Sequence, residues 1–518
     1  MMDFAFNLSS FFLMLYIISS ASLVMEYWMR TKSKQINIKN KKKKLPPTPW
    51  KLPILGHIHH LLGSPPHRAL AKLAQKHGDL MHVKLGEISA IVISSPRLAK
   101  QILRTHDLAF ADRAALLATK IVCYNGADIA SSPYGEFWRQ MRKICTQELL
   151  SAEKVRSFRS IRLDEASNVV SSVHELAGTG APVNLTAILG TYSSSMVFRA
   201  AFGKTSRHHK DTFLEVLKEA LPLVTSFDIS DLFPSYKFLH PFSWMRKQFV
   251  DVHKKIDGIF DSIIDEHVEN RTATQKGMSE CSEEDLVDVL LRVKESGSLQ
   301  IPINNDHVKA VLIDMFSAGT ETSSSIVEWA LSEMIRNPKV MARARDEIRR
   351  ELHGKQTVDE DDLCKLRYLK LVIKETLRLH PPGPLLVPRE CREECEVDGY
   401  IITTKTRVLV NAWAIGRDPE YWKNPECFDP DRFENGSVDY SGTHYEYIPF
   451  GAGRRMCPGI SFGVANIELP LALLLYHFDW ELPHGLNPND LDMSETTGLA
   501  ASRKTHLCLM ANPYDSSL

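Results

Sequence analysis

The fold of this chain is decided by the stretch Pro449-Phe450-Gly451-Ala452-Gly453-Arg454-Arg455-Met456-Cys457-Pro458-Gly459, which stands directly ahead of a long apolar run. Phe, Gly, Arg, Cys and Gly at relative positions 1, 4, 6, 8 and 10 should coincide by chance in on the order of one in ten thousand chains of this length. A thiolate at the start of a helix is stabilised by the positive end of the helix dipole and by free backbone N–H groups. The glycines let the backbone pass close to a flat macrocycle, and Arg455 is placed to meet a carboxylate on its rim. The stretch therefore marks Cys457 as a candidate metal-ligating thiolate, and a buried structural cysteine beside a glycine turn is the alternative.

Upstream, the sequence predicts a long helix from about residue 306 to residue 336, stopped by Asn337-Pro338. The middle of this helix is poor in helix formers and reads Ala318-Gly319-Thr320-Glu321-Thr322-Ser323. Gly costs about 1 kcal/mol relative to Ala in a helix, and Ser and Thr hydroxyls compete for the backbone carbonyls. We therefore expect the hydrogen-bond ladder to open here, where a ligand could enter. An ordinary core helix with a small-residue crossing point is the alternative.

Between these two segments lies Glu375-Thr376-Leu377-Arg378, on a predicted helix that His380-Pro381-Pro382 ends. Its two charges are three residues apart and therefore share one helix face. The spacing alone is uninformative, because other pairs share it: Glu136/Arg139, Glu153/Arg156, Glu333/Arg336 and Glu347/Arg350. Chain order distinguishes Glu375/Arg378, since Phe428-Asp429-Pro430-Asp431-Arg432-Phe433 follows it and precedes the cysteine stretch.

The N-terminus predicts a membrane anchor. Residues 4–25 carry no charge and would reach about 33 Å as a helix, enough to cross the hydrocarbon of a bilayer. Asp3 precedes this segment and a basic run follows it, which favours a retained anchor with the downstream chain in the cytosol rather than a cleaved signal. Residues 26–56 are basic and then Pro-rich, and we expect them to form a hinge, because Pro lacks the backbone donor of a helix or inner strand.

We expect the remaining residues, 57–518, to form one large domain that is mainly α-helical with small β-sheets. A hairpin is expected near residues 81–94, most periodic segments from 134 to 380 are typical of helices, and 384–411 of short strands. A last long helix is expected at about 460–477. No internal repeat divides this region.

Charge and cysteine content exclude two classes of protein. The 63 Lys and Arg residues balance the 63 Asp and Glu residues, and no long basic stretch lies beyond residue 44, so a nucleic-acid partner is not expected. Nine cysteines over 518 residues include no CxxC pair, so a disulfide framework is not expected either.

Taken in this order, the motifs resemble those of the cytochrome P-450 superfamily, and most closely those of its plant microsomal members. The resemblance covers nearly the whole chain. It implies the cytochrome P-450 fold and haem b as cofactor, with Cys457 as the axial ligand of the haem iron, in the loop that begins at Phe450. The segment Trp138-Arg139-Gln140-Met141-Arg142 resembles the family's Trp-x-x-x-Arg helix. By this resemblance four residues would reach the haem propionates: Trp138, Arg142, Arg389 and Arg455.

The same resemblance implies roles for further residues. Thr322 would hydrogen-bond dioxygen and, with Glu321, relay the protons that split the O–O bond. A buried structural triad behind the haem would consist of Glu375, Arg378 and Arg432. The substrate pocket would draw on Ala318, Leu386, Val387 and Leu499.

The activity that the resemblance implies is that of a haem-thiolate monooxygenase, which inserts one oxygen atom of O2 into a lipophilic small molecule. The plant subgroup points to a terpenoid of specialised metabolism, with an alkaloid or a phenolic compound as the alternative. Electrons would come from NADPH through a membrane-bound NADPH–cytochrome P-450 reductase, with cytochrome b5 as a further partner. The enzyme would be a single-pass protein of the endoplasmic reticulum membrane whose catalytic domain faces the cytosol.

Two functions of other classes stay open at this point. Gly459-Ile460-Ser461-Phe462-Gly463 satisfies the G-x-S-x-G pattern of a serine hydrolase, in which Ser461 would be the nucleophile. That pattern requires a buried strand just before the serine, whereas Gly-Arg-Arg-Met-Cys-Pro precedes it here. A non-catalytic haem sensor would keep Cys457 as a ligand without turning over.

Overall fold

The computed structural model describes residues 45–203, 206–224, 228–236, 243–275, 284–355, 358–483 and 485–514 of the 518-residue chain. The predicted anchor, residues 4–25, lies outside these residues. Of the predicted hinge, only residues 45–56 are described, and they contain neither a helix nor a named strand. An isolated bridge between Gly56 and Leu85 attaches this segment to the body.

Helices make up most of the described chain, as the sequence predicts. In chain order they are α2 (Pro66–His77), α3 (Pro96–Lys100), α4 (Leu117–Ile121), α5 (Glu136–Ile144), α6 (Ala152–Ser157), α7 (Arg159–Ala177), α8 (Leu185–Phe202), α9 (Lys210–Val224), α10 (Ile229–Leu232), α11 (Trp244–Gln275), α12 (Leu286–Glu295), α13 (Asn305–Gly319), α14 (Glu321–Arg336), α15 (Pro338–Glu351), α16 (Glu360–Leu363), α17 (Arg367–Leu379), α18 (Ala412–Ile415) and α19 (Ile460–His477).

Three small sheets accompany the helices in the described part of the chain. The strands are β1 (Leu80–Leu85), β2 (Ile88–Ile93), β3 (Val183–Asn184), β4 (Arg389–Glu390), β5 (Cys395–Val397), β6 (Tyr400–Ile402), β7 (Arg407–Val410), β8 (Phe478–Glu481) and β9 (Cys508–Pro513). They form sheets in the orders β1-β2-β7-β4, β3-β9-β8 and β5-β6. The sheet that contains β7 joins the N-terminal hairpin to the segment before the cysteine stretch, because β2 pairs with β7 in parallel.

The hairpin predicted near residues 81–94 is confirmed. β1 and β2 are antiparallel, with Leu85 opposite Ile88 and Gly86-Glu87 in the turn. Gly86 has φ +63°, and a Cβ there would stand 2.5 Å from the carbonyl oxygen of Leu232. Both the left-handed backbone and the close approach to α10 therefore require glycine at this position.

The last predicted helix is confirmed as α19, which begins at Ile460 and ends at His477. Among the described residues it is the one helix long and apolar enough to cross a membrane, and 61% of it is buried inside the protein. It packs against α7 and α14, and most of its buried residues belong to the largest hydrophobic cluster. Its apolar composition is therefore explained by its place in the core.

The helix predicted over residues 306–336 is broken where the sequence is poor in helix formers. α13 ends at Gly319 and α14 begins at Glu321, with Thr320 between them. The Thr320 hydroxyl donates to the carbonyl of Phe316 (2.8 Å), four residues back. This competition for backbone carbonyls is the predicted cause of the opening.

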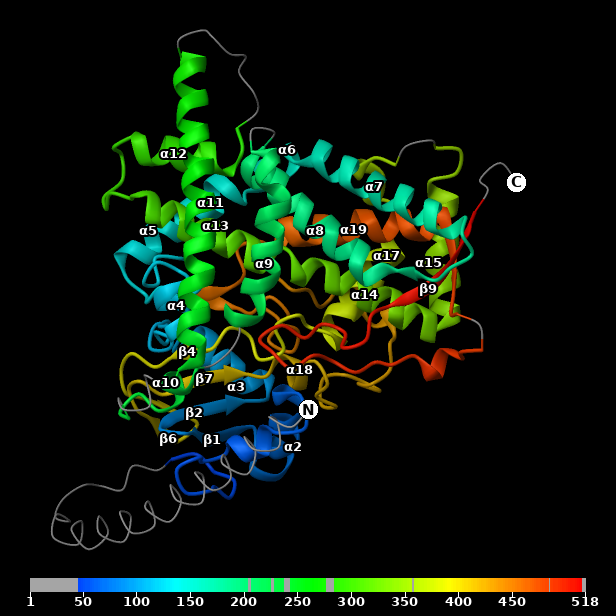
Figure 1. The fold of residues 1–518 in the computed structure, drawn as a ribbon. Coiled ribbons are helices and arrows are strands. Elements are labelled where there is room, and N and C mark those ends of the chain that lie inside the picture. Colours follow the sequence, from blue (N-terminus) through cyan, green and yellow to red (C-terminus); the bar gives the residue numbers. More distant parts are fainter. Residues whose placement is uncertain are drawn as a thin grey trace, which may run out of the picture.

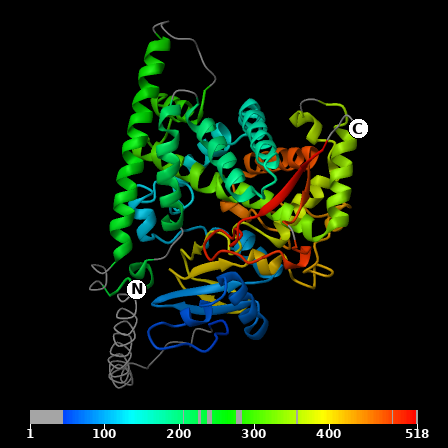
Figure 2. The ribbon, with the colours of Figure 1, turned by 45° about the vertical axis from the view of Figure 1, so that its right-hand side comes forward.

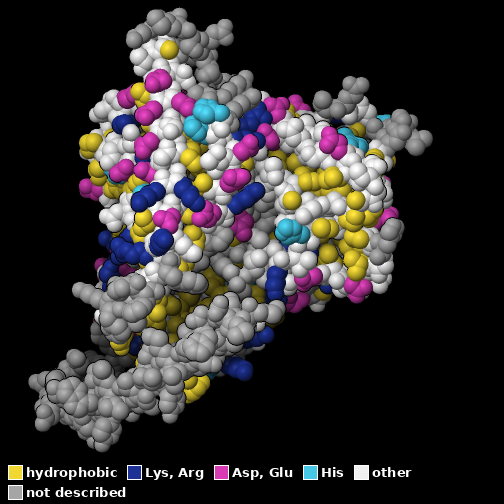
Figure 3. Space-filling view, viewed as in Figure 1, with side chains coloured by type: hydrophobic (Ala, Val, Ile, Leu, Met, Phe, Trp, Pro, Cys, Tyr) yellow, Lys and Arg dark blue, Asp and Glu magenta, His cyan; other side chains and the backbone are white. Residues whose placement is uncertain are grey.

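The helices and the larger sheet occupy different ends of the molecule. In Figure 1 the strands β1, β2, β4 and β7 lie together near α2 and α3, below the helices α8, α13, α14 and α19. The rotated view keeps this separation, and α11 runs along one side of the helical part (Figure 2). Figure 3 shows acidic and basic side chains intermixed over this face. The cysteine stretch connects the two ends, since it follows the sheet region and leads into α19.

Candidate functional site

Cys457 lies in a turn between a short 3-10 helix, Gly453–Arg455, and α19. Its backbone N–H donates to the carbonyl of Phe450 (3.0 Å), which closes the loop. Gly453 has φ +71°, and a Cβ at that position would overlap the carbonyl oxygen of Leu103. Glycine is therefore needed for the loop to pass this close to the neighbouring backbone.

The cavity that includes Cys457 has about 810 Å³ of atom-free volume, the open space at its mouth included. The junction of α13 and α14 contributes Ala318, Gly319 and Thr322 to the wall. Most of the remaining wall is apolar and includes Phe158, Val197, Met315, Phe450, Phe462 and Ile467.

The surroundings of the Cys457 sulfur suit a metal ligand. Burial raises the pKa of the thiol, while the backbone N–H of Gly459 and the charge of Arg142 act in the opposite direction. A thiol in apolar surroundings keeps its proton unless a cation compensates the thiolate charge, and coordination to a metal ion removes the proton outright.

Arg455 and Trp138 lie together beside the cysteine loop. The Arg455 guanidinium donates to the carbonyls of Ala111 (2.9 Å), Ile129 (3.2 Å) and Ser132 (2.5 Å). It also stacks over the Trp138 ring, 4.3 Å from its centre. Trp138 Nε1 donates to the same Ile129 carbonyl (2.9 Å). Residues that are far apart in the sequence thus converge at one side of the loop.

Arg142 and Arg389 reach the same loop from α5 and β4. Arg142 donates to the carbonyl of Met456 (2.5 Å), the residue before the predicted sulfur ligand. Arg389 donates to the Asp107 carboxylate (2.7 Å) and to the carbonyl of Ala452 (2.8 Å). The structure therefore brings all four predicted rim residues to the cysteine stretch.

Each guanidinium group near the loop makes the positive charge of the neighbouring guanidinium groups less favourable. Burial lowers the pKa of Arg455 to about 10, and Arg389 acts in the same direction. Burial also lowers the pKa of Arg113, with Arg455 and Arg389 adding to the effect. Buried cations of this kind are stabilised by an anion, and the two propionates of haem supply two negative charges. A partly buried thiol, apolar walls and this cationic rim fit haem.

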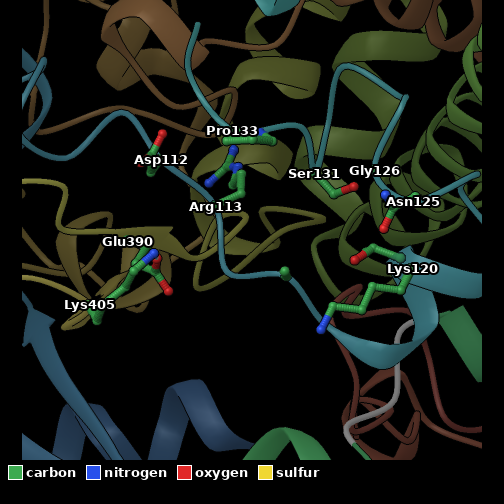
Figure 4. A pocket seen from close by; sticks show the side chains of 11 residues that line it. Asp112, Arg113, Lys120, Asn125, Gly126, Ser131, Pro133, Glu390 and Lys405 are labelled. Carbon is green, nitrogen blue, oxygen red and sulfur yellow. The ribbon is translucent and has the colours of Figure 1, made fainter.

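Arg113 was not singled out from the sequence. Its guanidinium donates to the carbonyls of Ala130 (2.9 Å), Val387 (2.5 Å) and Pro388 (2.7 Å). Figure 4 shows its side chain in the wall of a separate, polar pocket. No motif spacing marks this arginine, because its partners are brought to it by the fold rather than by the local sequence.

Of the two predicted catalytic residues, the structure brings one to the cavity. Thr322 lines the cavity, and its hydroxyl donates to the carbonyl of Ala318 (2.5 Å). The carboxylate of Glu321 instead accepts a hydrogen bond from the hydroxyl of Ser502 (2.8 Å). This hydrogen bond ties the Glu321 side chain to the segment before β9. A proton relay through Glu321 therefore stays a prediction.

Glu375, Arg378 and Arg432 form one buried ion-paired cluster. Arg378 makes two hydrogen bonds of 2.7 Å to the two carboxylate oxygens of Glu375, and Arg432 makes one of 2.9 Å. Arg378 also donates to the carbonyls of Gly416 and Pro425. The cluster thereby joins α17 to the irregular chain that leads to the cysteine stretch.

The predicted substrate residues are only partly brought together. Ala318 lines the cavity, whereas Leu386, Val387 and Leu499, although they belong to the described chain, do not contribute to its wall. The side chains of Val387 and Leu499 are exposed. The carbonyl of Val387 accepts a hydrogen bond from Arg113. That Leu386, Val387 and Leu499 contact the substrate stays a prediction.

A second group that sequence reasoning missed is the pair Asp128 and Asp314. Both are buried and share a hydrogen bond, and burial raises the pKa of each carboxyl. Asp314 lies on α13 in the wall of the cavity and accepts from the backbone N–H groups of Ile129 (2.7 Å) and Ala130 (3.2 Å). The sequence does contain one signal for Asp314. A carboxyl among the apolar residues of a predicted helix is costly to bury without hydrogen-bonding partners.

The hydrolase alternative fails on local structure. Residues 449–460 are all described and contain a 3-10 turn and no strand, whereas a nucleophile elbow follows a strand. Ser461 is the second residue of α19 and is exposed.

Comparisons with known proteins agree with this geometry. The model of the cytochrome P450 family matches residues 46–509. Premnaspirodiene oxygenase of Hyoscyamus muticus is 55% identical over 93% of this chain and 95% of its own length. The 5-epiaristolochene 1,3-dihydroxylase of Nicotiana tabacum is 52% identical over 93% and 95%. A solved zebrafish cytochrome P450 with abiraterone has a TM-score of 0.72 at 22% identity, covers 87% of this chain and 99% of its own, and shows the same fold.

The Glu375 cluster yields a stability prediction. Glu375→Ala would leave Arg378 and Arg432 without their shared carboxylate, and Arg378 is fully buried. We expect a loss of roughly 3–5 kcal/mol in the free energy of unfolding, because a buried charge without its partner is costly. Chemical denaturation of the full chain measures this loss.

The matched control is Glu136→Ala. Glu136 and Arg139 have the same three-residue spacing but form an exposed pair 3.8 Å apart. Its removal should cost about 1 kcal/mol or less. Equal losses in the two variants would show that the Glu375 cluster does not stabilise the fold.

The aspartate pair yields a pH prediction. Since the pKa values of Asp128 and Asp314 are raised in the folded state, the native protein binds more protons than the unfolded chain above the ordinary aspartate pKa. Stability should therefore fall as pH rises through the raised values, by at most about 1.4 kcal/mol per pH unit for each proton. Asp314→Asn keeps a hydrogen-bonding side chain without a charge and should flatten this dependence, measured as the thermal midpoint against pH. Asp306→Asn, at an exposed site on α13, should leave the slope unchanged; an Asp314→Asn slope equal to that of the wild type would contradict the assignment.

Proposed function

The chain belongs to the cytochrome P450 family and is a monooxygenase, and we propose that it oxidises a terpenoid while anchored to the endoplasmic reticulum membrane. The observation that carries the substrate class is the cavity at Cys457, whose wall is largely apolar. Such a wall favours a lipophilic molecule, because polar substrates would lose hydration without gaining partners.

Haem would be held by Cys457 at the iron and by Arg142, Arg389 and Arg455 at the propionates, with Trp138 beside them. When bound, it supplies the activation of dioxygen, one atom of which enters the substrate while the other leaves as water. The chain's own residues position this chemistry: the loop closed at Phe450 fixes the sulfur, and the cationic rim orients the macrocycle.

Thr322 is the polar group best placed to handle a proton near the substrate. Its hydroxyl lies in the cavity wall, at the break between α13 and α14. In this structure it donates to the carbonyl of Ala318 (2.5 Å), and rotation about one side-chain bond would turn the same proton toward the cavity.

The names of close relatives support a terpenoid substrate. One relative above 50% identity is a premnaspirodiene oxygenase and another a 5-epiaristolochene dihydroxylase. Both cover nearly the whole chain, so the same framework surrounds their sites. We assign a terpenoid to this chain on that similarity together with its apolar cavity.

Electron supply and location belong to the same proposal. Haem chemistry of this type needs two electrons, and we assign them to NADPH through a membrane-bound NADPH–cytochrome P-450 reductase, with cytochrome b5 as a second donor. The uncharged residues 4–25 and the basic run after them support a single anchor with the catalytic domain in the cytosol.

Spectroscopy and turnover test the reaction. The reduced, carbon-monoxide-bound protein should have the red-shifted Soret band of thiolate ligation, and Cys457→Ala should lose it. Cys364→Ala removes an exposed thiol and is the matched control. With reductase and NADPH, the wild type should add one oxygen atom to a terpenoid hydrocarbon, and Cys457→Ala should not.

The outcomes separate the two levels of the proposal. A normal band with no product from any of a panel of terpenoids would overturn the substrate class alone. The absence of the band in wild type would overturn thiolate ligation of haem.

Glycosylation tests the orientation in the membrane. Asn184, Asn270 and Asn435 lie in N-x-S/T sites, so a domain facing the lumen would carry glycan. We expect none in microsomes that contain the full chain, measured as mobility before and after endoglycosidase. An acceptor site added ahead of residue 4 should be modified, because that end would face the lumen. Glycan on any of the three native sites would contradict the proposed topology.

A further inference from the structure

Two adjacent histidines converge on one carboxylate far from the cysteine stretch in the sequence. His208 and His209 belong to a 3-10 turn, Arg207–His209, directly ahead of α9, and Glu266 lies on α11. His208 Nε2 stands 3.1 Å from Glu266 Oε1, and His209 Nε2 stands 3.0 Å from the same oxygen. All three atoms lie within 4.8 Å of one another.

This spacing is close to that of ligands around a small divalent ion. Zinc binds imidazole nitrogen and carboxylate oxygen at about 2.0–2.2 Å, and tetrahedral geometry then separates neighbouring ligand atoms by about 3.3 Å. Two of the three separations here are within a few tenths of an ångström of that value. Two histidines and one glutamate form a ligand set that zinc uses in proteins, with a further position open to water.

A hydrogen bond to its second oxygen also orients the Glu266 carboxylate. The Ser206 hydroxyl is fully buried and donates to Glu266 Oε2 (2.9 Å), which leaves Oε1 for the histidines. A hydrogen bond to the second oxygen of a ligating carboxylate is a usual feature of metal sites.

The three side chains are accessible from solvent. His208 is 64% exposed, while His209 and Glu266 are partly exposed. Figure 3 shows histidine side chains gathered at the surface of this face, close to charged residues. An ion could therefore enter without local unfolding.

A second candidate group, His267 with Asp285 and Asp288, is less suited to an ion. His267 Nδ1 donates to the carbonyl of Ile263 (2.7 Å), and Nε2 faces the Asp285 carboxylate (2.9 Å). His267 and Asp285 are both almost fully buried, so an ion could not reach them without local opening of the fold.

We propose that His208, His209 and Glu266 form a site for a divalent transition metal of the zinc class, which ties the start of α9 to α11. The consequence follows from packing. Phe213, in the first turn of α9, packs on Phe260 of α11 and Phe316 of α13, with ring centres 5.6 Å and 4.5 Å away. Phe316 lies two residues before Ala318 in the cavity wall. An ion at the site would thus restrain the helices that pack behind the cavity.

Zinc binding to the full-length holoprotein, without a histidine tag, tests the proposal. Equilibrium dialysis with metal analysis should find one Zn²⁺ per chain that depends on these residues. His209→Gln and Glu266→Gln should each weaken binding by at least about tenfold, and the double variant H208Q/H209Q should abolish it. Ser206→Ala should weaken it by about tenfold, because the carboxylate loses its orienting partner.

The matched control is the double variant H59Q/H60Q. His59 and His60 are also adjacent, with ring centres 3.9 Å apart, but they hydrogen-bond to the carbonyls of Gly56 and Trp50 rather than to a carboxylate. Their removal should leave zinc binding unchanged. Equal losses in this control and in H208Q/H209Q, or unchanged binding in Glu266→Gln, would mean adventitious histidine binding only and would overturn the site.

A second readout follows from mass action. A ligand that binds the native state alone raises the thermal midpoint, so zinc should raise it for the wild type and for H59Q/H60Q but not for H208Q/H209Q. Midpoints without zinc and the carbon-monoxide spectrum show that each variant is folded. A zinc-induced rise in H208Q/H209Q equal to that of the wild type would also overturn the proposal.

Discussion

One backbone hydrogen bond, from the N–H of Cys457 to the carbonyl of Phe450, determines where the sulfur lies. The bond closes a loop whose glycines at 451 and 453 adopt positive φ, which other residues rarely do. The loop leads within three residues into α19, whose buried side anchors it to the core. The position of the sulfur is thus set by the helical body, and the cavity wall and the arginine rim are arranged around a point that the core already fixes.

Ile129 connects that point to the cavity on the other side. Its carbonyl accepts from Trp138 and Arg455, and its N–H donates to the Asp314 carboxyl on α13. Through its carbonyl and its N–H, Ile129 therefore links the cationic rim at the cysteine loop to α13, the helix that lines the cavity. Burial raises the pKa of both the Asp314 and the Asp128 carboxyl, which favours a proton on the pair, and such a proton would remove one of two buried charges whose repulsion opposes this connection.

The parts that could be predicted from the sequence are those determined by neighbouring residues. The turn at Gly86, the start of α19 and the break at Thr320 follow from backbone freedom, apolar composition and hydroxyl competition, and each is local. Arg113 and Asp314 escaped prediction because their partners lie far away in the sequence, and neither has a diagnostic spacing. Family resemblance also assigned Val387 and Leu499 to the substrate pocket, and the wall of the cavity at Cys457 does not include them. Local sequence determines where helices, strands and turns form, whereas the packing of these helices and strands determines which side chains come into contact.

The same reasoning explains why the reaction is easier to infer than its substrate. Reaction chemistry depends on charged and hydrogen-bonding groups whose types are restricted, such as Cys457 and its arginines. The wall between Asp314 and Thr322, about 12 Å apart along the helix by rise per residue, is mainly apolar and holds its ligand through shape. An apolar contact discriminates one methylene by only about 1–3 kcal/mol, so a few substitutions such as those at Val197 or Phe462 could redirect oxidation without disturbing the machinery. Relatives with about half of their residues identical can therefore share this site and oxidise different carbon skeletons.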